Sequence, residues 1–297
     1  MDLINTPKLN EYIEFQVKAR IQEELKTFDN IHRENSLLKL QLKRHELHQN
    51  LANKALSDLA TFLSGRKTVS TKSIAIIIPT KNRVELLLSA LKSCAWQTRL
   101  PSEVIIINDG NQFSPPELES IENILKGKSS LVILSNEYSA GAAGGRKTGM
   151  EYSTCDILTY LDDDNLMWPT WLETIDREFQ IGSDQLIYGA QLRKEWNGAI
   201  LAEENFSHKK LCEKNFIDTG AIAHDKNFGN WDTDLKTLAN DWDFALSIAT
   251  GDNPSIRFVR EIASVYFTDA SERLSRFGSL NREGLKAKYQ TYYEKNA

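Results

Sequence analysis

The sequence predicts an α/β protein: a doubly wound, mainly parallel sheet flanked by helices, with a long-helix extension in front of it. Two observations support this fold class. After Gly65, short β-branched runs alternate with helical stretches, as in a sheet built from βαβ units. Before it, the segment from Leu9 to Ser64 contains neither proline nor glycine. We therefore divide the chain into a helical arm over residues 1–70 and an α/β domain over residues 71–297.

The helical arm is rich in Leu, Glu, Lys, Gln and Ala, which lose little side-chain freedom in helices. Its apolar residues recur every three or four positions, as in Ile13, Val17, Ile21 and Leu25, and this spacing indicates amphipathic, coiled-coil-like helices. This spacing places an apolar stripe along one face of the helix, and the stripe must pack against a partner. The partner is a second helix, the chain's own domain or another subunit. Oligomerisation, docking onto a membrane-associated assembly and a purely structural extension therefore remain open.

Within the α/β domain, five short runs are typical of strands buried on both faces. These runs are Ile74–Ile78, Val104–Ile107, Leu131–Leu134, Ile157–Leu161 and Leu186–Tyr188. Helical patterns occur at Arg83–Ala95, Pro116–Lys126, Gly145–Tyr152 and Phe244–Ala249. Ligands of open α/β sheets bind outside the carboxyl ends of the strands, so functional residues are expected just after these runs.

The composition is that of an ordinary globular chain. Hydrophobic residues make up 41% and charged residues 26%, and the net charge of −5 argues against a nucleic-acid binder. No apolar run approaches the roughly 20 residues of a membrane span, and no secretory signal is visible. The three cysteines lie far apart without a metal-ligand spacing, as is usual in a reducing compartment. These features predict a cytoplasmic protein.

Polar residues follow the first two predicted strands. The first strand leads into PTKNR at positions 79–83, where proline ends the strand ladder and Thr80 and Asn82 offer polar groups. The second strand ends in NDG at positions 108–110, and Asp109 can accept hydrogen bonds from a base or a ribose. Either segment alone is equally consistent with a helix cap or a turn.

A run of small residues, SAGAAGGRKTG at positions 139–149, follows the third predicted strand. Small residues let a backbone approach a ligand closely, and Arg146 and Lys147 can neutralise phosphate charge. The run matches neither the Walker phosphate loop nor GxGxxG, so an ATPase or a Rossmann dehydrogenase is not supported. A flexible turn is the alternative interpretation.

Three consecutive carboxylates, Asp162, Asp163 and Asp164, follow the fourth predicted strand directly. They repel one another unless a cation is present, and such oxygen ligands suit Mg²⁺ or Mn²⁺ with a diphosphate completing the coordination shell. The alternative is a solvated acidic turn. Asp241 and Asp243 open the last predicted helix, where they either cap the helix or supply a general base that faces the metal site.

Taken in order, the segments IIIPTKNR, INDG, GAAGGRKTG, LDDDN and NDWD resemble the pattern of glycosyltransferase family 2 on a GT-A fold. The resemblance covers roughly Ser73 to Gly278 and leaves out the helical arm. It implies an inverting, nucleotide-sugar-dependent and metal-dependent transferase whose DXD motif is Asp162–Asp164. This chain departs from the family pattern at Asn240, where an acidic residue is more common, and at Lys147, which replaces a common asparagine.

The resemblance also implies roles for individual residues. Asp241 is the implied catalytic base, and Asp164 with Asp162 is implied to hold the Mn²⁺ or Mg²⁺ ion. The implied nucleotide-binding residues are Pro79, Thr80, Asn82, Arg83, Asp109, Gly141, Arg146, Asp162 and Asp163. Segment 215–220 resembles the acceptor-side loop, and the implied acceptor residues are Asp218, Thr219, Gly220 and Trp242. Trp168 and Trp171 are either sugar-stacking walls or core, and core is favoured.

The implied reaction moves a sugar from a nucleotide diphosphate sugar, a UDP-sugar by family preference, to a hydroxyl of a saccharide or a lipid-linked saccharide. By analogy, its place is bacterial cell-surface polysaccharide synthesis, with peripheral association at the inner face of the membrane and a homo-oligomer formed through the arm. One alternative is a catalytically silent nucleotide-sugar-binding or scaffold protein that works through its arm, which the intact Asp164 and Asp241 disfavour. A sugar-phosphate nucleotidyltransferase is disfavoured because it typically has GxGxR where this chain has PTKNR.

Overall fold

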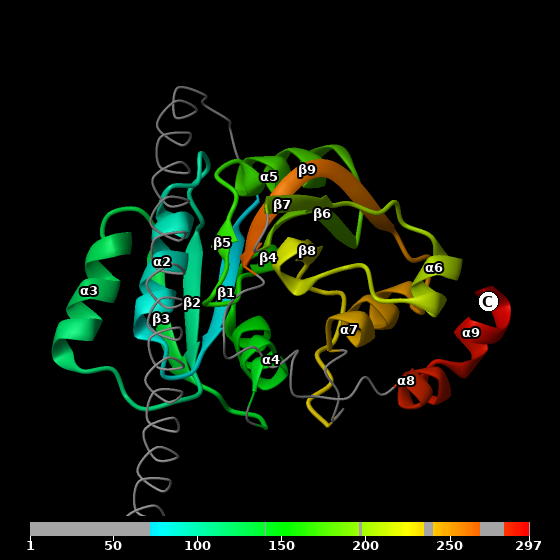
Figure 1. Cartoon of the computed structure of the whole chain (residues 1–297), viewed down its shortest axis with the longest axis horizontal. Coiled ribbons are helices and arrows are strands. Elements are labelled where there is room, and N and C mark those ends of the chain that lie inside the picture. Colours follow the sequence, from blue (N-terminus) through cyan, green and yellow to red (C-terminus); the bar gives the residue numbers. More distant parts are fainter. Residues whose placement is uncertain (1–71, 140, 196–197, 235–239, 268–281, 297) are drawn as a thin grey trace, which may run out of the picture. The chain divides into compact units, whose positions relative to one another are not determined.

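The computed structural model describes residues 72–139, 141–195, 198–234, 240–267 and 282–296. The helical arm predicted over residues 1–70 lies outside these residues. Within the described part of the chain, the strands form one nine-stranded sheet in the order β3-β2-β1-β4-β8-β6-β9-β5, with β7 paired to β6. Helices cover both faces of this sheet (Figure 1). The α/β fold class predicted from the sequence is therefore confirmed.

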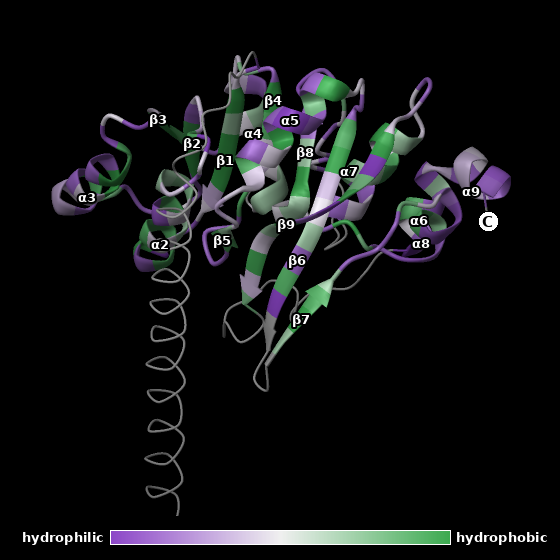
Figure 2. Ribbon diagram, turned by 90° about the horizontal axis from the view of Figure 1, so that it is seen from above, coloured by the Kyte–Doolittle hydropathy of each residue, from purple (hydrophilic) through white to green (hydrophobic). Residues whose placement is uncertain are grey.

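One side of the sheet is parallel, as predicted. Its strands are β1 (Ile74–Thr80), β2 (Glu103–Asn108), β3 (Ser130–Ser135) and β4 (Ile157–Tyr160). Between them come the helices α2 (Val84–Ala95), α3 (Pro115–Leu125) and α4 (Ala142–Tyr152). Strand β1 is hydrophobic along most of its length (Figure 2) and buried, whereas β3 is only partly buried because it lies at the edge of the sheet. The prediction of burial on both faces is therefore wrong for β3.

The other side of the sheet is mixed, so the prediction of a mainly parallel sheet holds for only one side. Its strands are β5 (Leu166–Met167), β6 (Leu186–Glu195), β7 (Gly198–Ala202), β8 (Ile222–Asp225) and β9 (Ile256–Phe267). Strand β8 runs antiparallel to β4 and β6, and β7 runs antiparallel to β6. Only two residues connect β6 to β7, and so short a connection permits only an antiparallel hairpin. The long strand β9 pairs with β6 and, farther along the chain, with β5 (Figure 1).

Side chains of β1 alternate between two hydrophobic cores, one on each face of the sheet. Ile74, Ile76 and Ile78 pack with α2, α3 and α5, whereas Ala75 and Ile77 face a core that includes residues of α6 to α9. These further helices are α5 (Trp171–Ile181), α6 (His208–Glu213), α7 (Asn240–Ala249), α8 (Arg282–Lys288) and α9 (Gln290–Asn296). The sheet is thus the middle layer of three.

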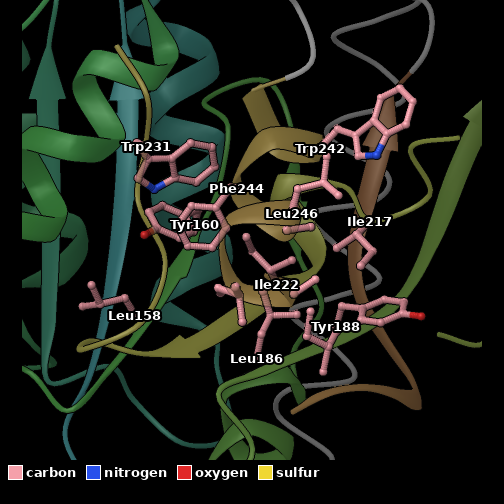
Figure 3. Close-up of a cluster of buried hydrophobic side chains, with 14 of the residues drawn as sticks. Leu158, Tyr160, Leu186, Tyr188, Ile217, Ile222, Trp231, Trp242, Phe244 and Leu246 are labelled. Atoms are coloured by element: carbon pink, nitrogen blue, oxygen red, sulfur yellow. The ribbon is translucent and has the colours of Figure 1, made fainter. Parts of the chain in front are cut away.

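Aromatic rings dominate the second of these cores. Tyr160, Trp231 and Phe244 lie together (Figure 3), and the ring centroids of Trp231 and Phe244 are 4.4 Å apart. On the opposite face of the sheet, Trp171 is fully buried and Trp168 is partly buried against the other core. Both tryptophans therefore contribute to core packing, the role favoured for them from the sequence.

Close packing of α4 on β1 explains two of the glycines in the segment 139–149, Gly145 and Gly149. A Cβ atom built on Gly149 would lie 2.5 Å from Cγ2 of Ile77, and one on Gly145 would lie 3.0 Å from Cβ of Pro79. These glycines let the helix lie directly against the strand, a role that the sequence analysis did not predict. Gly141, with φ of +123° and open space around its Cβ direction, precedes the helix and takes no part in this contact.

We expect the substitution Gly149→Ala to lower the free energy of unfolding by about 1–3 kcal/mol, the usual cost of overpacking a well-packed core. The added methyl would meet the buried, β-branched Ile77, which has little rotamer freedom to move away. Urea denaturation would measure the loss. In the double variant Gly149→Ala/Ile77→Ala, the loss in free energy of unfolding should be smaller than the sum of the losses in the two single variants. A loss equal to that sum would contradict this explanation.

Candidate active site

The carboxyl ends of the parallel strands bring the sequence-predicted residues together. Thr80 ends β1, Asp109 follows β2, and residues 162–164 lie just after β4. Backbone hydrogen bonds tie these ends to each other: the amide of Asp109 donates to the carbonyl oxygen of Thr80 at 2.9 Å, and that of Leu161 to Ile77 at 3.1 Å. This is the edge at which open α/β sheets bind ligands.

Asp163 is the innermost of the three carboxylates and is held by groups that follow β1. Thr80 Oγ1 donates to Asp163 Oδ2 at 2.6 Å, Arg83 Nε donates to the same oxygen at 3.2 Å, and Arg83 Nη2 pairs with Asp163 Oδ1. Asp163 is only 1% exposed, and burial raises its pKa to about 7 although Arg83 and Thr80 oppose the shift. A buried ionic link formed by Thr80, Arg83 and Asp163 thus joins the end of β1 to residues 162–164, which we call the acidic turn.

Asp109 holds the loop that leads into α4. Its Oδ1 accepts a hydrogen bond from Asn136 Nδ2 at 2.9 Å, and its Oδ2 accepts one from the amide of Gly141 at 3.1 Å. Lys81 Nζ lies 3.5 Å from the same carboxylate. Asn136 was missed by the sequence analysis, although it follows directly on β3, where polar residues were expected. The carboxylate of Asp109 therefore already organises three segments around the predicted nucleotide site.

Asn82, in the loop after β1, contacts the loop that follows β2. It has a positive φ of 55°, and its Oδ1 accepts a hydrogen bond from the amide of Asn111 at 2.7 Å. A Cβ atom on Gly110 would lie 2.2 Å from this Oδ1, so only glycine fits there. The loops after β1 and β2 are consequently locked together at this point.

Arg146 projects from α4 toward the acidic turn. Its Nη2 donates to Asp162 Oδ1 at 2.6 Å, and its guanidinium carbon lies 5.0 Å from the ring centroid of Trp231. Arg146 is only 6% exposed. Trp231 was missed by the sequence analysis because no motif surrounds it. The aromatic face and the carboxylate fix the position of this cation.

Asp241 lies in the first turn of α7, close enough to Arg146 and Asp218 for their charges to affect its pKa. Burial and the charge of Asp218 together raise its pKa to about 7, against the opposing effects of a hydrogen bond with Asn215 and the charge of Arg146. Burial and the charge of Asp162 likewise raise the pKa of Asp218. A partly exposed carboxylate whose pKa lies near neutrality has the property required of a general base.

A cavity of about 210 Å³ has in its lining two residues, Asn215 and Asp218, that also act on Asp241. It is lined by side chains from β6, from the segment after β7 and from segment 215–220, among them Gln191, Arg193, Glu203, Asn215 and Asp218. Since Asn215 and Asp218 also act on Asp241, the cavity and this carboxylate belong to one site.

The predicted acceptor residues do not all face this cavity. Asp218 lines it, and its Oδ1 accepts hydrogen bonds from Gln191 Nε2 at 2.7 Å and from the amide of Gly220 at 2.9 Å. Thr219 is buried in the short 3-10 helix η1 (Thr219–Ala221). Trp242 is 1% exposed and donates its indole N–H to the carbonyl oxygen of Leu211 at 2.7 Å. Trp242 is therefore part of the core and does not line the cavity.

Asp162 and Asp164 are the carboxylates that could hold a divalent cation. Within the described residues, no three His, Cys, Asp or Glu side chains are arranged to hold a metal ion by themselves. Mg²⁺, however, is usually bound by one or two carboxylates, with substrate phosphates and waters completing its octahedron. The side chain of Asp162 is 30% exposed, and both residues offer only oxygen ligands. This donor set fits Mg²⁺ or Mn²⁺ bound together with a diphosphate.

None of the helices that the structure describes has both the length and the apolar character of a membrane span.

Comparison with known proteins agrees with this architecture. The chain is 23% identical over 220 residues to the UDP-Glc:alpha-D-GlcNAc-diphosphoundecaprenol beta-1,3-glucosyltransferase WfgD of Escherichia coli, which covers 71% of this chain and 83% of WfgD. It is 25% identical over 124 residues to the glucosyl-dolichyl phosphate glucuronosyltransferase of Haloferax volcanii, and this match covers 42% of the chain but only 39% of that relative.

Among solved structures, residues 1–349 of TarS from S. aureus, crystallised with UDP-GlcNAc, superpose with a TM-score of 0.56 at 12% identity. The match covers 75% of this chain and 73% of that one, and it supports the GT-A fold. The family model described as glycosyl transferase family 2 matches residues 75–252, which hold the strand ends, Arg146, the acidic turn and Asp241. The chain therefore belongs to glycosyltransferase family 2.

Proposed function

We propose that this protein is an inverting glycosyltransferase that moves a sugar from a UDP-sugar to a hydroxyl of a lipid-linked saccharide in cell-surface polysaccharide synthesis. The observation that carries the proposal is Asp241: a carboxylate with a pKa near 7 that shares one electrostatic cluster with Arg146 and with Asp218, and Asp218 lines a polar cavity. The names of WfgD and of the Haloferax enzyme specify lipid-linked acceptors, and that of WfgD specifies a UDP-sugar.

In the proposed reaction, Asp241 removes the proton from the acceptor hydroxyl in the cavity. The hydroxyl oxygen then forms a bond to the anomeric carbon of the donor sugar from the face opposite the diphosphate. The bond between this carbon and the diphosphate oxygen breaks, and its electron pair leaves with UDP, so the anomeric configuration inverts. Arg146 stabilises the negative charge that develops on the leaving diphosphate.

Asp164 and Asp162 are proposed to hold a Mg²⁺ or Mn²⁺ ion with the donor diphosphate. When bound, such an ion neutralises charge on the leaving group. The proposed role of Arg146 at the same diphosphate fits its position, since it already pairs with Asp162 at 2.6 Å.

We expect UDP binding to depend on the divalent ion. In calorimetric titrations, UDP should bind well with Mn²⁺ and at least about tenfold more weakly after chelation, because one or two carboxylates cannot hold the diphosphate without a cation between them. Asp164→Ala should remove most of the metal effect, whereas Asp252→Ala, which changes an exposed carboxylate, should not. Equal UDP affinity with and without metal would contradict the proposed metal site.

The proposed activity itself is tested by offering a panel of UDP-sugars with undecaprenyl diphosphate-linked GlcNAc and following sugar transfer to the lipid. Transfer from one UDP-sugar, with inverted anomeric configuration in the product, would support the proposal. Tight UDP-sugar binding without transfer or hydrolysis would favour instead the catalytically silent relative. Products that retain the donor's anomeric configuration would exclude the direct displacement.

A further inference from the structure

A lysine from the C-terminal helices joins two acidic residues that stand next to different parts of the candidate active site. Lys288, the last residue of α8, places its Nζ 2.7 Å from Asp243 Oδ1 and 2.8 Å from Asp232 Oδ2. Tyr289 OH donates a second hydrogen bond to Asp243 Oδ1 at 2.8 Å. Asp243 is 1% exposed, so its charge depends on these partners rather than on water.

The two carboxylates stand beside residues already placed in the site. Asp243 follows Asp241 by two positions in the first turn of α7. Asp232 follows Trp231, whose ring lies against the guanidinium of Arg146. Lys288 therefore connects the turn that carries Asp241, the proposed base, with the segment of Trp231. Trp231 in turn supports Arg146, the residue proposed to contact the donor diphosphate.

The position of Lys288 is fixed by packing on both sides of it. Leu285 of α8 is fully buried in the same core as Trp242 and Phe244. Farther along the chain, Tyr292 of α9 contacts His208 of α6, with 2.6 Å between its hydroxyl oxygen and His208 Nδ1. Helices α8 and α9 are thus anchored to the hydrophobic core, and Lys288 is held as part of the site's framework.

We propose that Lys288 is a positioning residue for the transfer reaction: it holds the turn of Asp241 and the segment of Trp231 in one fixed relation. The inference rests on the proposed function, since it takes Asp241 to be the base. Two charge-assisted hydrogen bonds from one ammonium group add an ionic link between two segments that also touch through the stacked rings of Trp231 and Phe244. A change in this separation moves the base relative to the donor, and displacements of about 1 Å can cost about 10²-fold in rate.

The test compares Lys288→Met with Lys288→Arg and with Lys286→Met, a matched control on the same helix whose lysine is 53% exposed and pairs only weakly with Glu283. We expect Lys288→Met to lower kcat by at least about tenfold. The KM for the UDP-sugar and the affinity for UDP should change by less than about threefold, because the nucleotide-binding residues are untouched. Lys288→Arg should recover most of the turnover, and Lys286→Met should behave as wild type.

Loss of Lys288 leaves a buried carboxylate without its cation, so the single variant could unfold. The double variant Lys288→Met/Asp243→Asn removes that charge and keeps a polar group for Tyr289. It should fold and remain slow, and wild-type turnover in the folded double variant would overturn the inference. Asp241→Asn serves as the reference in the same assay. If it is inactive while Lys288→Met is unimpaired, the positioning role fails; if it is fully active, the proposed function fails.

Discussion

Replacing Asp241 by asparagine is expected to lower kcat by about 10²–10⁴-fold, the usual contribution of general-base assistance. Asparagine keeps the size of the side chain and can still contact Asn215, but it cannot accept the proton of the acceptor hydroxyl. Initial rates of sugar transfer at saturating donor and acceptor would measure the loss. Because the base does not contact the diphosphate in the proposed reaction, UDP affinity should stay near that of the wild type.

The pH dependence gives an independent check on the same residue. A base is active when deprotonated, and burial places the pKa of Asp241 at about 7. For the wild type, kcat/KM should therefore be low below pH 7, rise as the pH passes through this value and level off above it. Asp241→Asn should lack this rise, and Asp252→Asn, a change at an exposed position, should keep it. Turnover near that of wild type in folded Asp241→Asn would remove Asp241 from the role.

The largest expected effect on stability comes from Arg83. The substitution Arg83→Met should lower the free energy of unfolding by about 3–5 kcal/mol, because it leaves the fully buried Asp163 without its cation. The deficit should grow as the pH rises above 7, where Asp163 ionises in the wild type, and should be complete only above the still higher pKa that the loss of Arg83 gives Asp163. It should shrink as the pH falls below 7, since protonated Asp163 needs no counter-charge. Denaturation curves of both proteins over a pH series would measure the difference.

Two further variants isolate the cause of this loss. Arg177→Met removes an arginine that pairs only at the surface, and it should cost no more than about 1 kcal/mol. The double variant Arg83→Met/Asp163→Asn removes the unpaired charge and should recover part of the stability. A loss of less than about 1 kcal/mol in Arg83→Met itself would show that the ion pair does not hold the acidic turn.

Several features of the site could be predicted from sequence because local patterns encode them. The strands at residues 74–78 and 104–107 were recognisable as β-branched runs, and the structure extends each by only two residues. The polar residues after them were placed at the ligand-binding edge by the rule for parallel sheets alone. The acidic turn could be predicted in the same way, because its three aspartates directly follow a recognisable strand.

Other features depend on contacts between residues far apart in the chain. Strand β9 was not recognised because charged residues interrupt its apolar pattern, and its pairing with β6 includes register shifts. Trp231 and Asn136 have no motif of their own, and they matter because of the side chains that they meet, Arg146 and Asp109. No one-dimensional pattern identifies such partners.

The sequence by itself determined the α/β class, the family and the set of polar residues at the strand ends, since each depends on residues near one another in the chain. Only the tertiary structure decided how the carboxylates divide their roles. Arg83 pairs with the buried Asp163, and Arg146 pairs with Asp162. Burial, together with the charge of Asp218, raises the pKa of Asp241. The physical reason is that an ionisable group takes its properties from its burial and from nearby charges, and folding alone brings those charges together.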